Sequence, residues 1–117
     1  MNWLHWLRRQ LSRPAPVPLQ QRVYANPLDL VLAASLQGRA VPTVELLAAY
    51  PTLTPAEVEA LAPRLAELHE QAMTLGSLVN RQELDQNTAY DRLWQAYPEL
   101  DRGNLGSLLW QAFVGTR

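Results

Sequence analysis

The pattern Leu-x-x-Ala-Tyr-Pro-x-Leu occurs twice in the chain, first over residues 46–53 and again over residues 93–100. A proline disfavours helical backbone in the residue before it, so one helix is expected to end at Tyr50 and another at Tyr97. The residues after each motif favour the start of a new helix. The repeat therefore predicts two helix–turn–helix elbows.

Each elbow contains the signals that begin its second helix. In the first, Thr54 can cap the helix, Pro55 suits its first position, and Glu57 completes a capping box. In the second, Asp101 can cap the helix but Asn104 replaces the glutamate, so this box is incomplete. We expect the two elbows to adopt one local structure.

The remaining pattern indicates an all-α protein, a small bundle of five or six short helices within residues 26–117. A chain of 117 residues suits one such domain. Asn26 and Pro27 supply a cap and a first helical residue, and Gly38 supplies a helix end. The polar residues 80–87 predict a loop.

Two further features bear on the helices of this bundle. Thr88 with Asp91 resembles a second capping box and predicts a helix that begins there. Apolar residues three and four positions apart run from Val58 to Val79, which is typical of a coiled-coil seam. This seam either packs in the chain's own core or forms a homodimer. Pro63 lies within it and predicts a kink or a division near Ala62.

Residues 1–13 predict an amphipathic helix, and residues 14–25 a proline-rich spacer. The helix could dock on its own domain, on a protein partner or on a membrane surface. Its predicted contacts lie on an apolar face and an adjoining basic one: Trp3, Leu4, Trp6, Leu7, Leu11, Arg8 and Arg9.

The last third of the chain is rich in aromatic residues. Trp94, Trp110 and Phe113 are predicted partner contacts, because large aromatic side chains often anchor protein interfaces. Two interpretations stay open: one of the two tryptophans is an exposed interface anchor, or these rings fill the core with partly exposed edges.

The sequence offers little chemistry. It has no cysteine, and its two histidines, His5 and His69, lie far apart, so we expect no metal site, no cofactor and no enzyme activity. The net charge is −1, with a basic cluster within residues 1–13 and an excess of acidic residues in the rest. No stretch is long and apolar enough for a membrane span.

Residues 45–61 resemble the helix–turn–helix segment of small bacterial antitoxin-type proteins, in which a Tyr-Pro-x-Leu-Thr turn joins two helices. That resemblance implies DNA binding. The charges oppose it, because a recognition helix offers basic or amide side chains near its start, and here Glu57 and Glu59 stand there.

We therefore expect a non-catalytic helical interaction protein of the cytoplasm, an accessory or assembly subunit that docks on a larger protein complex. Two alternatives stay open. One is a helix–turn–helix DNA-binding or antitoxin-like regulator, and the other is a peripheral membrane protein anchored by residues 1–13.

Overall fold

The computed structural model describes residues 24–116, and every regular element in that part is a helix. The all-α prediction is therefore correct for the described residues. The predicted helix within residues 1–13, and the spacer up to residue 23, lie outside them. The helices are α2 (Pro27–Leu36), α3 (Thr43–Ala49), α4 (Pro55–Asn80), α5 (Gln86–Ala96) and α6 (Arg102–Gly115).

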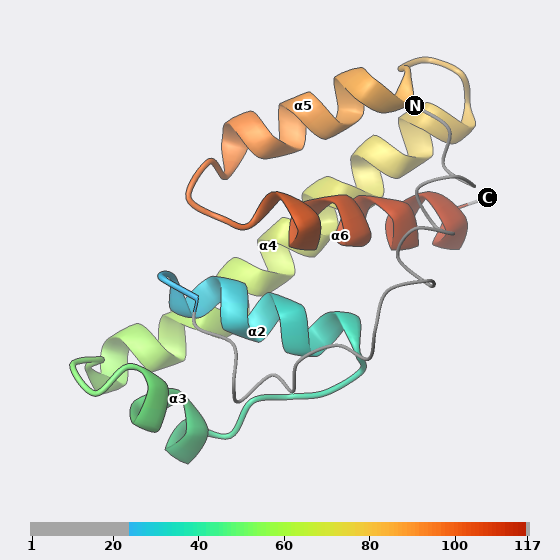
Figure 1. Cartoon of the computed structure of the whole chain (residues 1–117). Coiled ribbons are helices and arrows are strands. Elements are labelled where there is room, and N and C mark those ends of the chain that lie inside the picture. Colours follow the sequence, from blue (N-terminus) through green and yellow to red (C-terminus); the bar gives the residue numbers. More distant parts are fainter. Residues whose placement is uncertain (1–23, 117) are drawn as a thin grey trace, which may run out of the picture.

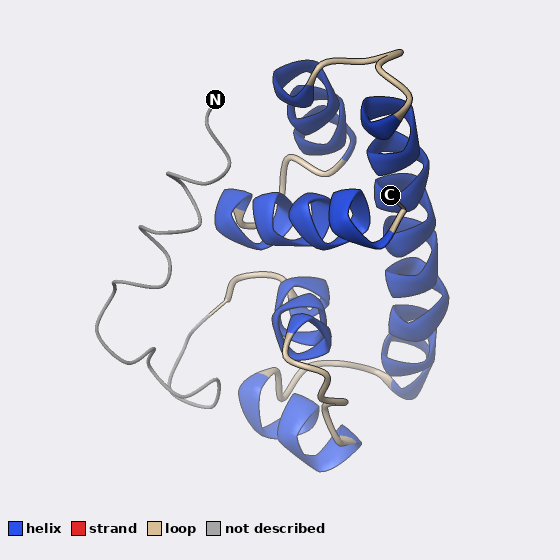
Figure 2. Ribbon diagram, turned by 90° about the vertical axis from the view of Figure 1, so that its right-hand side faces the viewer, coloured by secondary structure: helices blue, strands red, loops and turns tan. Residues whose placement is uncertain are grey.

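Helix α4 is the longest element, with 26 residues, and it runs diagonally behind α6 and α2 in Figure 1. The other four helices lie along the same side of it, with α5 at one end and α3 at the other (Figure 2). α6 packs most closely on α4, and α2 lies beside α6.

Pro63 does not divide α4, which is continuous from Pro55 to Asn80. An internal proline removes one helical hydrogen bond. Leu61 and Leu68 flank it and are both buried, so packing against the other helices holds the two halves of α4 in one helix.

The predicted seam of α4 belongs to the chain's own core. Leu61, Leu68 and Ala72 are buried, and the other four members of the seam are partly buried and pack against the same cluster. A homodimer through this seam stays a prediction that a single chain does not test. The core is completed by leucines and alanines of the other helices and of the second elbow: Leu28, Leu30, Leu32, Leu46, Ala89, Leu93, Leu100, Leu105, Leu108, Leu109 and Ala112.

The two elbows share their backbone hydrogen bonds. The N–H of Tyr50 donates to Leu46 O at 2.8 Å, and the N–H of Tyr97 donates to Leu93 O at 3.1 Å. One turn later, Leu53 and Leu100 each donate to the carbonyl of the elbow tyrosine, both at 3.1 Å. The repeated motif therefore produces a repeated local structure.

The caps of the elbows also follow the sequence. Thr54 and Glu57 form the reciprocal capping box at the start of α4. Asp101 caps α6 alone, accepting a hydrogen bond from the N–H of Asn104 at 3.0 Å. The first elbow is thus closed by two cap bonds and the second by one.

Helix α5 begins earlier than predicted. Its cap is Asp85, whose carboxylate accepts the N–H of Thr88 at 2.9 Å and the Thr88 hydroxyl at 2.7 Å. Thr88 is therefore the third residue of the helix and not its cap. The prediction of a box from Thr88 to Asp91 was wrong because the stronger acceptor stands three residues upstream.

Candidate functional site

A buried polar link joins α2 to the start of α6. Asp29 is only 4 % exposed, and its carboxylate accepts the N–H of Asp101 at 2.8 Å and the side-chain amide of Asn104 at 2.9 Å. Burial raises the pKa of Asp29, while the hydrogen bonds from Asn104 and Asp101 oppose that rise. Both oxygens of the Asp29 carboxylate therefore already accept hydrogen bonds inside the protein. The side chain orients α6, and neither oxygen is open to a substrate.

Ser35 and His69 meet between α2 and α4, with 3.3 Å between the serine Oγ and the imidazole Nε2. The serine hydroxyl donates its proton to Leu32 O at 2.8 Å. The imidazole can then only donate to this oxygen, whereas activation of a serine nucleophile requires it to accept the proton. The pair joins two helices. Local sequence patterns could not reveal it, because the two residues are 34 positions apart.

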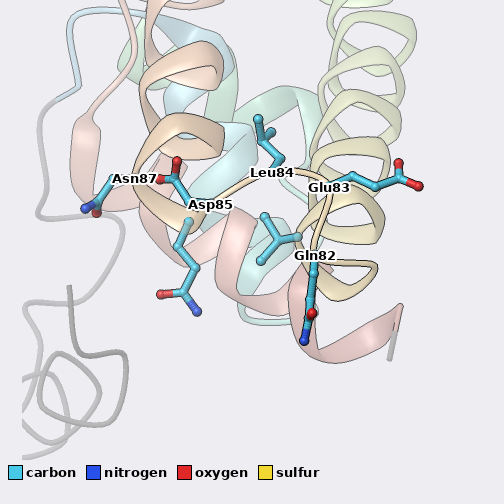
Figure 3. Close-up of a pocket in the computed structure, with 7 residues that line it drawn as sticks. Gln82, Glu83, Leu84, Asp85 and Asn87 are labelled. Carbon is cyan, nitrogen blue, oxygen red and sulfur yellow. The ribbon is translucent and has the colours of Figure 1, made fainter.

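The loop between α4 and α5 surrounds a hollow of about 540 Å³ (Figure 3). Its acidic side chains do not converge on that hollow. Figure 3 shows Glu83 directed away from Asp85 and Asn87. Glu83 lies 3.6 Å from Arg81 in a salt bridge, and the Asp85 carboxylate caps α5. This arrangement does not resemble a pair of catalytic carboxylates. The described residues also contain no group of three or more side chains suited to hold a metal ion.

The most organised surface feature is a cluster of Tyr90, Trp94 and Arg102, which we call the α5–α6 cluster. The guanidinium carbon of Arg102 lies 3.6 Å from the ring centre of Trp94. The Tyr90 hydroxyl donates to the backbone carbonyl of Arg102 at 3.3 Å. Tyr90 and Trp94 are half-buried against the core, and Arg102 is exposed.

The sequence predicted one member of this cluster. Trp94 was expected to be a contact, whereas Tyr90 and Arg102 were not selected. Tyr90 precedes Trp94 by four residues, which places both on one face of a helix and could have identified it. Arg102 stacks on Trp94 only because the second elbow folds α6 back towards α5.

The other two predicted aromatic contacts lie together elsewhere. Trp110 and Phe113 are half-buried on α6, with 5.9 Å between their ring centroids. They stand near the C-terminal end of α6, whereas Trp94 contacts its first residue. The structure therefore separates the three predicted C-terminal contacts into two places. The predicted contacts of the N-terminal segment, Trp3 to Leu11, lie outside the described residues.

An apolar groove lies between α2, α3 and α4, with a volume of about 510 Å³. Its walls are mainly aliphatic and come from all three helices and the loop before α3: Val31, Val41, Leu46, Val58, Leu61 and Leu65. Helix α3 forms one wall although only one of its seven residues, Leu46, is buried. Val44 and Leu47 on the same helix are exposed by 81 % and 40 %.

None of the described helices combines the length and the apolar character that crossing a membrane requires. The chain matches no protein-family model, no curated protein sequence and no solved structure.

Proposed function

We propose that the protein is a non-catalytic helical interaction protein, an accessory or assembly subunit that docks on a larger protein complex. The observation that carries the proposal is the α5–α6 cluster. Its three residues, Tyr90, Trp94 and Arg102, belong to the residue types that most often supply the binding energy of protein interfaces. They form one surface cluster that is held together by a stacking contact and a hydrogen bond.

The cluster is ordered before any partner binds. Arg102 is held over Trp94 by stacking, and its backbone carbonyl is fixed by Tyr90. Side chains that are already in place lose less conformational entropy on binding. Within the described residues Arg102 forms no salt bridge, so its N–H groups are available for a carboxylate or a backbone carbonyl. The cluster suits a protein surface with an apolar recess and an acidic or carbonyl-rich edge.

We propose two further contacts. Trp110 and Phe113 form a second aromatic surface on α6. The apolar face of residues 1–13, from Trp3 to Leu11, is the third proposed contact, and its support is the sequence pattern alone.

The charges favour a protein partner over DNA. The first turn of α4 presents Glu57, whose side chain bonds the backbone of Thr54, and Glu59 follows. The first turn of α6 follows Asp101, and its basic residue, Arg102, covers Trp94. Phosphate contacts supply much of the affinity for DNA. The membrane alternative depends wholly on residues 1–13, which the structure does not describe.

Affinity capture with the full-length tagged chain, followed by mass spectrometry, tests the proposal. The parent should enrich a defined protein complex. Arg102→Ala and Trp94→Ala should each lose that complex, while Gln95→Ala, an exposed position on the same helix, should retain it. Circular dichroism should show that Arg102→Ala keeps the parent's helical signal and thermal midpoint. Capture of the same proteins by folded Arg102→Ala and Trp94→Ala variants would overturn the proposal.

A further inference from the structure

The groove between α2, α3 and α4 lacks a covering element among the described residues, although aliphatic side chains line most of it. A groove with such walls accepts the apolar face of a helix, with side chains three and four positions apart as anchors. Helix α3 is well suited to be an adjustable wall, because Leu46 is its only buried residue.

We infer that the groove binds the chain's own residues 2–12, so that the N-terminal segment docks on its own domain when no partner is present. The apolar face of that segment offers two tryptophans and three leucines, Trp3, Trp6, Leu4, Leu7 and Leu11. A helix of this length is about 16 Å long. Such a short helix is marginal in water on its own, so an apolar surface is needed to stabilise it.

The connection to the domain permits this docking. The described chain begins at Tyr24, whose backbone carbonyl accepts a hydrogen bond from the Tyr50 hydroxyl at 2.6 Å. Tyr50 caps the C-terminal end of α3, which forms one wall of the groove. Tyr24 also packs against the same alanine pair as Val41, a residue of the groove wall. The attachment point of the segment is therefore next to the groove.

The spacer is long enough to reach every part of it. At about 3.1 Å per residue, an extended proline-rich stretch over residues 13–23 spans roughly 34 Å. The seven-residue helix α3 is only about 10 Å long. A segment tethered at this range experiences an effective concentration in the millimolar range, so even a weak contact is populated.

The charges around the groove are of both signs. Residues 1–13 contain Arg8, Arg9 and Arg13 and no acidic residue. The charged residue that lines the groove is Arg39, which forms a salt bridge with Glu45 at 3.3 Å, and Glu57, Glu59 and Arg64 stand nearby on α4. The inferred docking therefore rests on apolar contacts and on the position of the tether. The inference does not depend on the proposed function, because it concerns the free chain.

Disulfide trapping in the full chain tests the inference, and the absence of native cysteine makes the readout unambiguous. The test pair is Leu7→Cys with Ala62→Cys, which stands on the groove wall. The control pair is Leu7→Cys with Ala60→Cys, an exposed position of the same helix that does not line the groove. The two sites are two residues apart on α4, and the Trp3→Ala/Trp6→Ala background given below tests whether a difference in rate requires the apolar face of the segment.

Under mild oxidation at low protein concentration, the test pair should form an intramolecular disulfide at least about tenfold faster than the control pair, as expected for a docked segment. Adding Trp3→Ala and Trp6→Ala should remove that difference. Equal rates for the two pairs, or disulfide-linked dimers as the main product of the test pair, would overturn the inference.

A second measurement does not depend on any cysteine variant. The amide NMR signals of the groove residues Val58 and Leu65 should shift between the parent chain and the Trp3→Ala/Trp6→Ala variant. The signals of residues in the α5–α6 cluster should not. Shifts confined to α5 and α6 would overturn the inference by placing the segment on the other surface.

Discussion

The carboxylate of Asp29 accepts a hydrogen bond from the side-chain amide of Asn104 at 2.9 Å, and the two residues are 75 positions apart. Their contact is buried, and it orients the start of α6 against the start of α2. Replacing Asn104 by alanine leaves one carboxylate oxygen without its donor in a desolvated place. We expect Asn104→Ala to lower the free energy of unfolding by about 1–3 kcal/mol, measured by chemical denaturation.

The pH dependence of that loss is a sharper test. Burial raises the pKa of Asp29 above its ordinary value of 3.8, and the Asn104 bond opposes the rise. A carboxyl group with a raised folded-state pKa stabilises the fold fully below its unfolded pKa, and that contribution is lost as the pH rises through the folded pKa. Without Asn104 the pKa rises further, so Asn104→Ala should cost more at neutral pH than at mildly acidic pH. In an Asp29→Asn background, Asn104→Ala should cost the same free energy of unfolding at neutral and at mildly acidic pH. A persistent difference between the two pH values would show that another titratable group is responsible.

At Gly76, the close contact between α4 and α6 decides how a substitution changes the stability of the protein. A Cβ atom at this position would lie 2.9 Å from the Ala112 carbonyl carbon and 2.9 Å from the Phe113 nitrogen. Alanine improves helix propensity by about 1 kcal/mol, but overpacking against backbone typically costs about 1–3 kcal/mol. We expect Gly76→Ala to be less stable than the parent by about 1 kcal/mol, measured as a shift of the denaturation midpoint.

Gly115 provides the matched control for this substitution. It ends α6, and a Cβ there would meet nothing within 4 Å. Gly115→Ala should therefore leave the midpoint unchanged or raise it slightly. A Gly76→Ala variant as stable as Gly115→Ala would mean that α4 and α6 do not cross as closely as the structure shows.

The sequence predicted most features of this fold that depend on neighbouring residues, with exceptions at the start of α5 and at Pro63. The caps at Asn26, Thr54 and Asp101, and the ends at Tyr50 and Tyr97, follow from interactions within about one helical turn. Each of them appears in the structure where it was expected.

The features that sequence reasoning missed depend on chain segments that only the fold brings together. Helix propensity alone makes Gly76 a weak point in α4, whereas the structure shows that the backbone of α6 approaches closely there. The stacking of Arg102 on Trp94 and the contact of Ser35 with His69 have the same origin. The groove could not be predicted either, because its wall is made by three helices.

Two helices end in the same hydrogen-bond pattern with different residues at the left-handed position. After α2, Gly38 has φ 72°, and after α4, Gln82 has φ 60°. In both, the next N–H reaches back to a carbonyl near the helix end, from Arg39 to Ala34 and from Glu83 to Leu78. This is the Schellman motif, in which glycine is preferred because a Cβ atom is strained at positive φ.

The pair predicts opposite effects of exchanging the residue types. Gln82→Gly should stabilise the protein by about 0.5–1 kcal/mol, since relief of left-handed strain exceeds the added unfolded-state entropy. Gly38→Ala should destabilise it by about 1 kcal/mol, and that cost is purely conformational because no atom lies within 4 Å of the new Cβ. Thermal midpoints of the two single variants measure both effects. A destabilised Gln82→Gly variant would show that the glutamine side chain contributes more than its backbone strain costs.

The two elbow tyrosines differ in their hydroxyl contacts despite their shared backbone pattern. The Tyr50 hydroxyl donates to Tyr24 O at 2.6 Å, with Asn26 O as a second acceptor at 3.4 Å, and ties the beginning of the described chain to the end of α3. Within the described part of the chain, the Tyr97 hydroxyl has no hydrogen-bond partner. Both rings are half-buried against the core.

Removing the two hydroxyls one at a time therefore isolates this bond. Tyr50→Phe should lower the free energy of unfolding by about 1 kcal/mol, because the Tyr24 carbonyl loses its donor while the ring still packs. Tyr97→Phe should change the free energy of unfolding by only a few tenths of a kcal/mol, because the substitution removes a hydroxyl that forms no hydrogen bond within the described residues. Denaturant titration of the two variants in parallel gives the comparison. Hydrogen exchange at Leu46 and Tyr50 should also speed up in Tyr50→Phe alone, because α3 is held by few other contacts. Equal losses in the two variants would mean that the Tyr50 hydroxyl does not anchor α3.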